Sequence, residues 1–391
     1  MTERFDVVLV GAGLANAMTA LALAKLRPGV RVALVERKPA LDFEQTFCFH
    51  GSDVDAVPRA WSWLEPVVSH SWAGYDVRFP AYERSFSSAY HCIAGQPLAT
   101  RLEETVRAMG GRSFLGCDVT HASDRRVLLA DGRVVEGEVV LDGRGAEAPA
   151  QGTGYQKFVG WEVELDHGSA PLPHRPLLMD ARVDQVDGYR FMYVLPFGEA
   201  RALLEDTYFS STGLLREADI EARMTAYLQA AGWRLRRIVR KEKGVLPMPW
   251  VENPLRPRAD AAIEVGYRGG FFQAATGYSL PAAVRVAQAV ADAEALSQPS
   301  VRAALAPVRR RLVARNRFYR TLNRLSFRGV HDHDRCAVFE RFYRLPAPLI
   351  ERFYAGESSI WDRVRIIGGR PPVPLSRFTL GRLMRVMEEA S

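Results

Sequence analysis

Near the N-terminus the chain reads Phe5-Asp6-Val7-Val8-Leu9-Val10-Gly11-Ala12-Gly13-Leu14-Ala15-Asn16, a β-branched run followed by a glycine turn. The run before the glycines predicts a β-strand, and the Ala- and Leu-rich segment that continues to Leu26 predicts a helix. A second β-branched run, from Arg31 to Glu36, predicts another strand. This order indicates a βαβ unit whose glycine turn lies at the carboxyl edge of a parallel sheet.

The turn from Gly11 to Asn16 has the composition of a dinucleotide-binding loop, because glycines let backbone N–H groups approach a pyrophosphate at a helix N-terminus. Glu36 lies 25 residues after Gly11, near the spacing expected of a carboxylate that binds ribose hydroxyls. Asn16 replaces the usual third glycine or alanine, which affects helix packing rather than phosphate contact. The alternative is a βαβ unit that binds no ligand.

A second glycine-rich boundary, Thr276-Gly277-Tyr278-Ser279-Leu280-Pro281, precedes a predicted helix from Ala282 to Leu296. Together with the N-terminal position of the first turn, this boundary resembles the way in which flavoproteins of the hydroxylase-like superfamily close over FAD, so FAD is favoured over NAD. Between these segments the pattern predicts several strands and a helix near Glu217 to Ala231. The predicted strands are Val127–Leu129, Val134–Asp142, Phe158–Leu165, Leu177–Val183, Tyr189–Leu195 and Arg201–Thr207. Residues 40–100 are aromatic and irregular.

Composition excludes several classes of protein. The 391 residues are 48% apolar, with no uncharged stretch of about 20 apolar residues, so no membrane-spanning helix or signal peptide is expected. The four cysteines lack a C-x-x-C spacing, so neither a zinc site nor a disulfide framework is predicted, and a reducing cytoplasm fits. The run from His331 to Asp334 is read as a polar turn, and no metal site is predicted.

Basic charge is concentrated at the C-terminus: residues 300–391 contain 19 Arg and 8 Asp or Glu. Such a segment suits a nucleic acid or an anionic membrane surface. Arg309-Arg310-Arg311 and the aromatic residues that follow favour peripheral contact with a membrane over nucleic acid. A solvated basic helix packed on its own domain is an equally good interpretation. No protein partner is predicted.

Several motifs resemble the bacterial lycopene beta-cyclases (CrtY type). They are spread over nearly the whole chain and occur in the same order as in that family, which short accidental matches would not. The matching stretches are Gly11–Ala17, Val140–Gly145, Gly154–Gly160, Met179–Ala181, Asp187–Phe191, Tyr193–Pro196, Leu204–Thr207, Ala275–Pro281 and Arg341–Pro346.

The resemblance implies an α/β fold of the hydroxylase-like flavoprotein superfamily. We expect a discontinuous Rossmann-like FAD-binding domain in residues 1–150 and 260–300, into which an antiparallel substrate domain of residues 151–259 is inserted. Residues 301–391 would form a basic helical region with possible membrane contact. The residues expected to bind FAD are Gly11, Ala12, Gly13, Leu14, Ala15, Asn16, Glu36, Arg37, Asp142, Gly143, Thr276, Gly277, Tyr278, Ser279 and Leu280.

The resemblance also implies the reaction. The family converts the linear ends of lycopene and related carotenoids into beta-ionone rings, using FAD in its reduced form with NAD(P)H only as reductant. Glu205, in Leu203-Leu204-Glu205-Asp206-Thr207, matches the family's catalytic acid, and burial would keep it protonated. From the residues alone, Glu205 reads as a solvated acid at the end of a strand. Asp206 would point to the opposite face of that strand.

Aromatic rings in the matched segments are candidates to stabilise a carbocation, although most such residues pack in cores. They are Trp161, Tyr189, Phe191, Tyr193, Phe271, Phe272 and Tyr278. Two other functions stay open. One is a redox flavoenzyme of the same superfamily that reduces or oxygenates an isoprenoid, and the other is a non-catalytic flavin-binding membrane protein.

Overall fold

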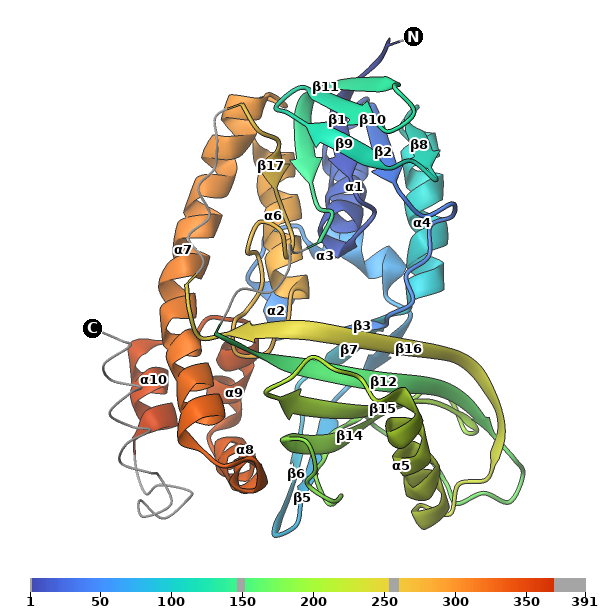
Figure 1. The fold of residues 1–391 in the computed structure, drawn as a ribbon, viewed down its shortest axis with the longest axis vertical. Coiled ribbons are helices and arrows are strands. Elements are labelled where there is room, and N and C mark those ends of the chain that lie inside the picture. The colour runs from blue at the N-terminus through green and yellow to red at the C-terminus, as the bar shows by residue number, and fades with distance from the viewer. Residues whose placement is uncertain (1, 146–151, 253–259, 369–391) are drawn as a thin grey trace.

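The structure is a computed structural model that describes residues 2–145, 152–252 and 260–368. Two large sheets lie one above the other, with helices beside the first and C-terminal helices flanking the second (Figure 1). A small third sheet, of β3 (Phe47–His50), β7 (Tyr90–Ile93) and β4 (His70–Trp72), belongs to the segment that leads from one large sheet to the other.

The first sheet contains the predicted βαβ unit and is parallel at its centre. Strand β1 lies between β2 and β11, and β8 and β17 extend the parallel part on either side. Two antiparallel strands, β10 and β9, complete the sheet next to β11. The strands are β1 (Thr2–Val10), β2 (Val32–Glu36), β8 (Arg112–Leu115), β9 (Val119–Ala122), β10 (Arg126–Leu129), β11 (Val134–Asp142) and β17 (Ile263–Glu264).

Side chains of β1 alternate between two cores, as the period of a strand requires. Val7 and Leu9 pack against a layer of helices, whereas Val8 and Val10 enter a smaller core shared with β9 and β10. The helices of that layer are α1 (Leu14–Leu26), α4 (Gly95–Ala108) and α6 (Leu280–Asp292), with the short α2 (Ser52–Asp55), α3 (Trp61–Leu64) and η1 (Glu65–Val67) beside them. The predicted α/β fold is confirmed.

The second sheet has the order β16-β12-β15-β14-β13-β5-β6 and is antiparallel except between β13 and β5. Its strands are β16 (Leu235–Pro249), β12 (Thr153–Leu165), β15 (Arg201–Ser210), β14 (Tyr189–Pro196), β13 (Leu177–Asp180), β5 (Tyr75–Phe79) and β6 (Tyr82–Phe86). Four of them match predicted strands. Residues 75–86 were expected in the first domain, but they pair with the second sheet, and the domain boundaries otherwise stay a prediction.

The two faces of the second sheet are also different. Leu204 and Tyr208 of β15 pack against α5 (Glu217–Ala230), which covers the outer face. Leu203 and Phe209, which alternate with them, face the first sheet and the C-terminal helices. The inner face of β15 is therefore the side on which a site between the sheets is built.

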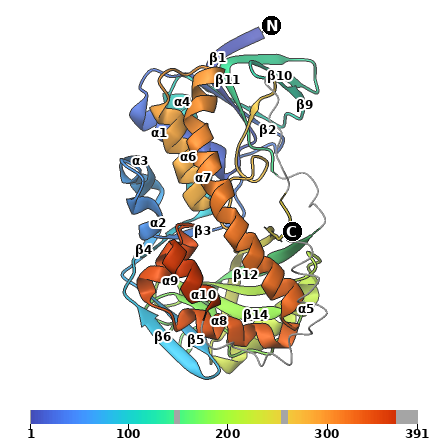
Figure 2. The same ribbon diagram turned by 90° about the vertical axis from the view of Figure 1, so that its left-hand side faces the viewer.

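C-terminal helices connect the two sheets. The helix α7 (Gln298–Arg324) contacts α6 and β11 at one end and β16 towards the other, so it spans both layers (Figure 2). It continues through a π-helical turn, η2 (Leu325–Gly329), and a short turn, η3 (Asp332–Asp334). The remaining helices are α8 (Arg335–Tyr343), α9 (Ala347–Tyr354) and α10 (Ile360–Ile367).

Within α7, Arg309 is turned towards the protein. Its guanidinium lies 4.9 Å from the centre of the Phe271 ring and donates to the carbonyl of Glu264, while Arg310 and Arg311 stay exposed. The predicted basic surface of three arginines is therefore wrong for Arg309, because a stacked guanidinium packs well on an aromatic face.

Arg335 connects the C-terminal helices to the second sheet through hydrogen bonds. Its side chain is 1% exposed and donates to the carbonyls of Phe209, Ser326 and Phe327. We expect Arg335→Ala to lower the free energy of unfolding by about 2–3 kcal/mol, because two buried carbonyls and one half-buried carbonyl lose a charged donor. Urea denaturation measures this change, with the exposed Arg107→Ala as control. Equal midpoints for the two variants would contradict this role of Arg335.

Candidate active site

The glycine turn after β1 needs its glycine. Gly11 has φ +85°, and a Cβ there would lie 3.0 Å from the carbonyl oxygen of Gly143. Asn16 is fully buried in the first turn of α1, where its Nδ2 donates to the carbonyls of Val10 at 3.0 Å and of Gly11 at 2.7 Å. Asn16 therefore holds the helix against the turn and does not face the cavity described below, as expected for the residue at the third glycine position.

Glu36 ends β2 beside this turn. Its Oε2 accepts the backbone N–H of Ala12 at 2.7 Å, so strand and turn are tied together. Asp142, at the end of β11, is 3% exposed and binds Arg144 at 2.7 Å and Arg268 at 3.1 Å. Asp142 thus positions two arginines next to the turn, whereas Glu36 itself lines the cavity.

The second predicted loop leads into α6. Gly277 has φ +69°, and a Cβ there would lie 2.7 Å from the Cβ of Leu246 on β16, so the loop packs directly on the second sheet. The hydroxyl of Tyr278 lies 2.7 Å from the carbonyl oxygen of Cys48 and 3.0 Å from Oδ2 of Asp53. Tyr278 therefore connects α6, β3 and α2 at one point.

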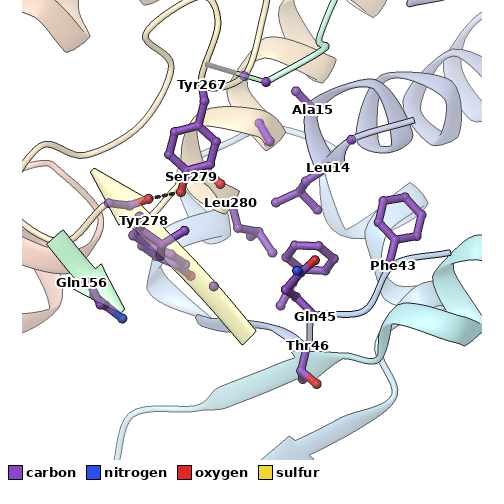
Figure 3. Close-up of a pocket in the computed structure, with 18 of the residues that line it drawn as sticks. Leu14, Ala15, Phe43, Gln45, Thr46, Gln156, Tyr267, Tyr278, Ser279 and Leu280 are labelled. Carbon is purple, nitrogen blue, oxygen red and sulfur yellow. Dashed lines mark hydrogen bonds between the residues drawn. The ribbon is translucent and has the colours of Figure 1, made fainter. Parts of the chain in front are cut away.

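A cavity of about 790 Å³ joins the two loops to the second sheet. In Figure 3, Leu14, Ala15 and Phe43 lie across the cavity from Tyr267, Tyr278 and Ser279. Of the residues expected to bind FAD, those that line it are Gly11, Gly13, Leu14, Ala15, Glu36, Arg37, Gly143, Thr276, Gly277, Tyr278, Ser279 and Leu280. Ala12, Asn16 and Asp142 do not line the cavity. They stabilise the residues that do, through the hydrogen bonds and ion pairs described above.

Glu205 lies on the wall formed by the second sheet, on the inner face of β15 with Leu203 and Phe209. Burial raises the pKa of Glu205 well above its usual range, and the neighbouring carboxyl of Glu242 raises it further. Asp206 points to the other face, as predicted, and is bound there by Arg190 at 2.8 Å. The two neighbouring acids therefore do not form a pair.

Glu242, on β16, is a candidate functional residue that sequence patterns did not indicate. It is 2% exposed, and its Oε2 accepts the backbone N–H of Thr46 at 3.0 Å, the hydroxyl of Thr46 at 2.9 Å and a contact from Arg240. It lies in Arg240-Lys241-Glu242-Lys243, which reads as a solvated charge run. Only the pairing of β16 with β12 brings it to the site.

Aromatic side chains make up much of the cavity wall near Glu205. Among the predicted candidates, Phe191, Tyr193 and Tyr278 line it. Trp161 faces the core under α5, and Tyr189, Phe271 and Phe272 pack elsewhere. Further lining rings that sequence patterns did not single out are Tyr90, Phe158, Phe209, Tyr343 and Tyr354.

Two buried polar groups close the end of the cavity near Tyr278. His50 lies among the rings of Tyr75, Tyr90 and Tyr354, with centroids 4.9–5.2 Å away, and burial lowers the pKa of His50 to about 3. Asp53 is fully buried, and burial raises its pKa to about 7 despite the hydrogen bonds that it accepts from the backbone N–H of His50 and the hydroxyl of Tyr278. Both groups are therefore neutral in slightly acidic solution.

Comparison with known proteins identifies the family. The family model described as lycopene cyclase protein matches residues 6–380. The lycopene beta-cyclase of Paracoccus sp. (strain N81106 / MBIC 01143) is 40% identical over 381 residues, 95% of each chain, and that of Pantoea ananas is 36% identical over 387 residues, 96% of this chain and 97% of its own. The chain belongs to the lycopene cyclase family.

Solved structures show the fold that this lycopene cyclase family member shares with other proteins. A geranylgeranyl bacteriochlorophyll reductase-like protein from Thermoplasma acidophilum has a TM-score of 0.62 at 12% identity, covering 99% of this chain and 100% of its own. The probable FAD-dependent monooxygenase pqsL from Pseudomonas aeruginosa has a TM-score of 0.56 at 19% identity, covering 82% and 97%. The two-sheet architecture is thus common to enzymes of different chemistry.

The raised pKa of Asp53 predicts a pH-dependent loss of stability. In the unfolded chain an Asp titrates near ~3.9, so the stabilisation from neutral Asp53 is complete below that pH and is lost as the pH rises through about 7. Asp53→Asn removes this loss. We expect its free energy of unfolding, relative to the unmodified protein, to rise by roughly 1–3 kcal/mol between pH 5 and pH 8.

Urea denaturation at several pH values measures this difference, and Asp55→Asn, an exposed carboxyl of the same helix, is the matched control. A constant difference between Asp53→Asn and the unmodified protein across this range would show that Asp53 is ionised throughout.

Proposed function

We propose that this chain is a lycopene beta-cyclase, which closes the linear psi ends of lycopene into beta-ionone rings to give gamma-carotene and then beta-carotene. The observation that carries the proposal is the position of Glu205, a half-buried acid on the mainly apolar wall of the cavity, where its surroundings raise its pKa. Its relatives in Paracoccus and Pantoea, similar over nearly the whole chain, carry the same activity in their names.

Ring closure begins with a proton, because an isolated alkene carbon becomes electrophilic only when it is protonated. The donor must be neutral at the working pH, and a carboxyl group meets this condition when it is buried among apolar groups. Glu205 has these surroundings, with Leu203 and Phe209 on its own strand. We therefore assign Glu205 as the catalytic acid.

The tertiary carbocation that results needs a surface that neither reacts with it nor admits water. Rings such as Phe158, Phe191 and Phe209 present π-electron faces, which attract positive charge. Attack by the neighbouring double bond then closes the ring, and loss of a proton restores neutrality. Substrate and product are isomers, so the reaction needs no net electron transfer.

We also propose FAD as the cofactor. The turn at Gly11 and Gly13 opens at the N-terminus of α1, where no side chain caps the helix, so its N–H groups suit a pyrophosphate. Glu36 and Arg37 would bind the adenosine side, and Thr276–Leu280 would hold the opposite part of the cofactor. In its reduced anionic form FAD supplies negative charge near the cation, and NAD(P)H serves only to reduce it.

Replacing Glu205 by Gln tests the acid. We expect Glu205→Gln to reduce the rate of lycopene cyclisation by at least about 100-fold, because the amide has no proton of suitable acidity. Chromatography of carotenoids from liposome assays measures the rate, and flavin absorbance checks that FAD binding is retained. Glu164→Gln, a strand carboxyl that pairs with Arg237 outside the cavity, is the control. Cyclisation by Glu205→Gln at the rate of this control would remove Glu205 from the mechanism.

The number of NADPH molecules consumed per ring formed distinguishes a cyclase from a redox flavoenzyme of the same fold. Under anaerobic conditions with lycopene, FAD and NADPH, an isomerase consumes far less than one NADPH per ring formed. Consumption of one NADPH per product, with a reduced carotenoid, would instead indicate an isoprenoid reductase with the same fold.

We further propose that the protein works in the cytoplasm at a membrane surface, where carotenoids dissolve. Ile360, Trp361, Val364 and Ile367 lie along α10 and are 55–76% exposed. They recur at helical spacing, which gives α10 one apolar side. Helix α10 is bound to α9 through Arg352 and Asp362, and Tyr354 of α9 lines the cavity. Helix α10 is thus linked through a single neighbouring helix to the wall of the cavity.

Within the described ranges, no helix combines the length and apolar character needed to cross a bilayer. Residues 369–391, the end of the predicted basic region, lie outside the described residues.

Substitution of Trp361 and Val364 together by Ser tests this surface. We expect at least a tenfold loss of binding to anionic liposomes in a flotation assay, because burial of each side chain contributes about 1.5–3 kcal/mol. Leu214→Ser, an apolar residue that is 59% exposed elsewhere, is the control. Neutralising Arg310 and Arg311 measures the contribution of α7 in the same assay. If the Trp361 and Val364 variant floats with liposomes as well as the unmodified protein does, α10 is not the surface that contacts the membrane.

A further inference from the structure

Two glutamates meet over a glycine on the inner face of the second sheet. Strand β12 lies between β15 and β16, and Gly160 is in register with Glu205 on one side and with Glu242 on the other. The three residues therefore form one row across three strands, and all point to the same face.

Gly160 is the residue that lets the two carboxyl groups approach each other. A Cβ at this position would lie 2.8 Å from the Cγ of Glu242 and 2.9 Å from the Cγ of Glu205. Any other residue in the middle of this row would force the two side chains apart. Glycine weakens a strand interior, so its presence here points to a close approach of the neighbouring groups.

The two oxygens of Glu242 have different surroundings. Its Oε2 accepts from Thr46 N–H, from Thr46 Oγ1 and from the Arg240 guanidinium, which is the bonding of an ionised carboxylate. Its Oε1 is buried and accepts no hydrogen bond from any described side chain or backbone group. The Glu205 carboxyl lies across Gly160 from Glu242, and the two carboxyl groups interact.

Few other charged or titratable groups face Glu205. Arg240 acts on it from β16 and favours its ionised form, while Cys48 from β3 disfavours that form. Tyr193 is its partner in register on β14, and the hydroxyl of Tyr193 is hydrogen-bonded to that of Tyr90. Arg240 is itself shared between Glu242 and Glu162. The strongest influence of a single neighbour on Glu205 is therefore Glu242.

We propose that Glu205 and Glu242 share a single proton across Gly160, and that Glu242 is the positioning residue that keeps this proton on Glu205. The inference rests on the proposed function, in which Glu205 is the catalytic acid. It adds the reason why a carboxyl that lines a cavity stays protonated at neutral pH. Two carboxyl groups in contact cannot both ionise without strong repulsion, so the pair retains one proton, as in other carboxyl dyads.

The pair also has a consequence for the return of the proton. When Glu205 donates its proton to the alkene, both carboxyl groups are ionised and face the new carbocation, with Arg240 as their counter-ion. The proton that leaves the ring balances the one that was donated, so the pair regains its single proton in each cycle and no co-reactant is needed. Glu242 does not touch the substrate in this scheme.

Glu242→Gln tests the proposal because the surrounding donors fix the orientation of the new amide. Thr46 N–H and Arg240 require an oxygen at the Oε2 position, so the NH₂ group takes the Oε1 position and donates to Glu205. This favours ionised Glu205. We expect the alkaline limb of the pH profile of kcat/KM for cyclisation to move at least about one pH unit lower, with activity regained in more acidic buffer.

A second readout does not need turnover. In infrared difference spectra recorded against pH, the carbonyl band of a protonated carboxyl that is missing in Glu205→Gln belongs to the pair. We expect this band to disappear at lower pH in Glu242→Gln than in the unmodified protein. Glu164→Gln removes a carboxylate of the same strand β12 that pairs with Arg237 and leaves both the row and Arg240 intact, so it serves as control and should keep the limb and the band in place.

The outcomes separate the two proposals. If Glu205→Gln is inactive but Glu242→Gln keeps both the alkaline limb and the infrared titration of the unmodified protein, the shared proton is refuted and Glu205 remains the acid. If Glu205→Gln cyclises lycopene normally, the proposed function of Glu205 fails. A uniform loss of activity in Glu242→Gln at every pH, with the band unmoved, would make Glu242 a structural residue only.

Discussion

A carboxyl group is kept in its neutral form by burial among apolar groups, and burial where the two sheets meet raises the pKa of Glu205 well above its usual range. The inner face of β15 supplies Leu203 and Phe209, and β14 supplies Phe191 and Tyr193. Cys48 closes the site from the small third sheet, and Arg240 is kept occupied by two other carboxylates. Strands from distant parts of the chain are thus arranged around the Glu205 carboxyl group.

Local signals were sufficient for the parts of the fold in which chain neighbours are also spatial neighbours. The βαβ unit, the glycine turn at Gly11 and the loop before α6 follow from strand and helix patterns, because backbone conformation there depends on adjacent residues. The alternation in β15 also placed Asp206 on the face opposite Glu205. For Asn16, the sequence pattern correctly indicated packing rather than phosphate contact.

Long-range pairing explains what sequence patterns missed. Residues 75–86 are short strands whose burial depends on β13, which is about 100 residues away. Strand β16 carries Arg237, Arg240 and Glu242, whose charges are paired with side chains on neighbouring strands. Because charged residues occupy these positions, the sequence of β16 does not show the alternation of polar and apolar residues that predicts a strand. Arg309 was expected at a surface because stacking on Phe271 has no local signature. The role of Glu242 depends on register across two strand pairs, which no single stretch of sequence contains.

The long helix α7 contacts both sheet layers, and this has a consequence for how the cavity behaves over time. A helix resists bending along its axis, so the two layers cannot swing apart like a clam shell while the contacts of α7 with α6, β11 and β16 persist. While these contacts persist, a flexible polyene end would have to fold to the shape of the cavity walls, so the walls rather than a closing motion of the two layers would set its conformation before the ring closes.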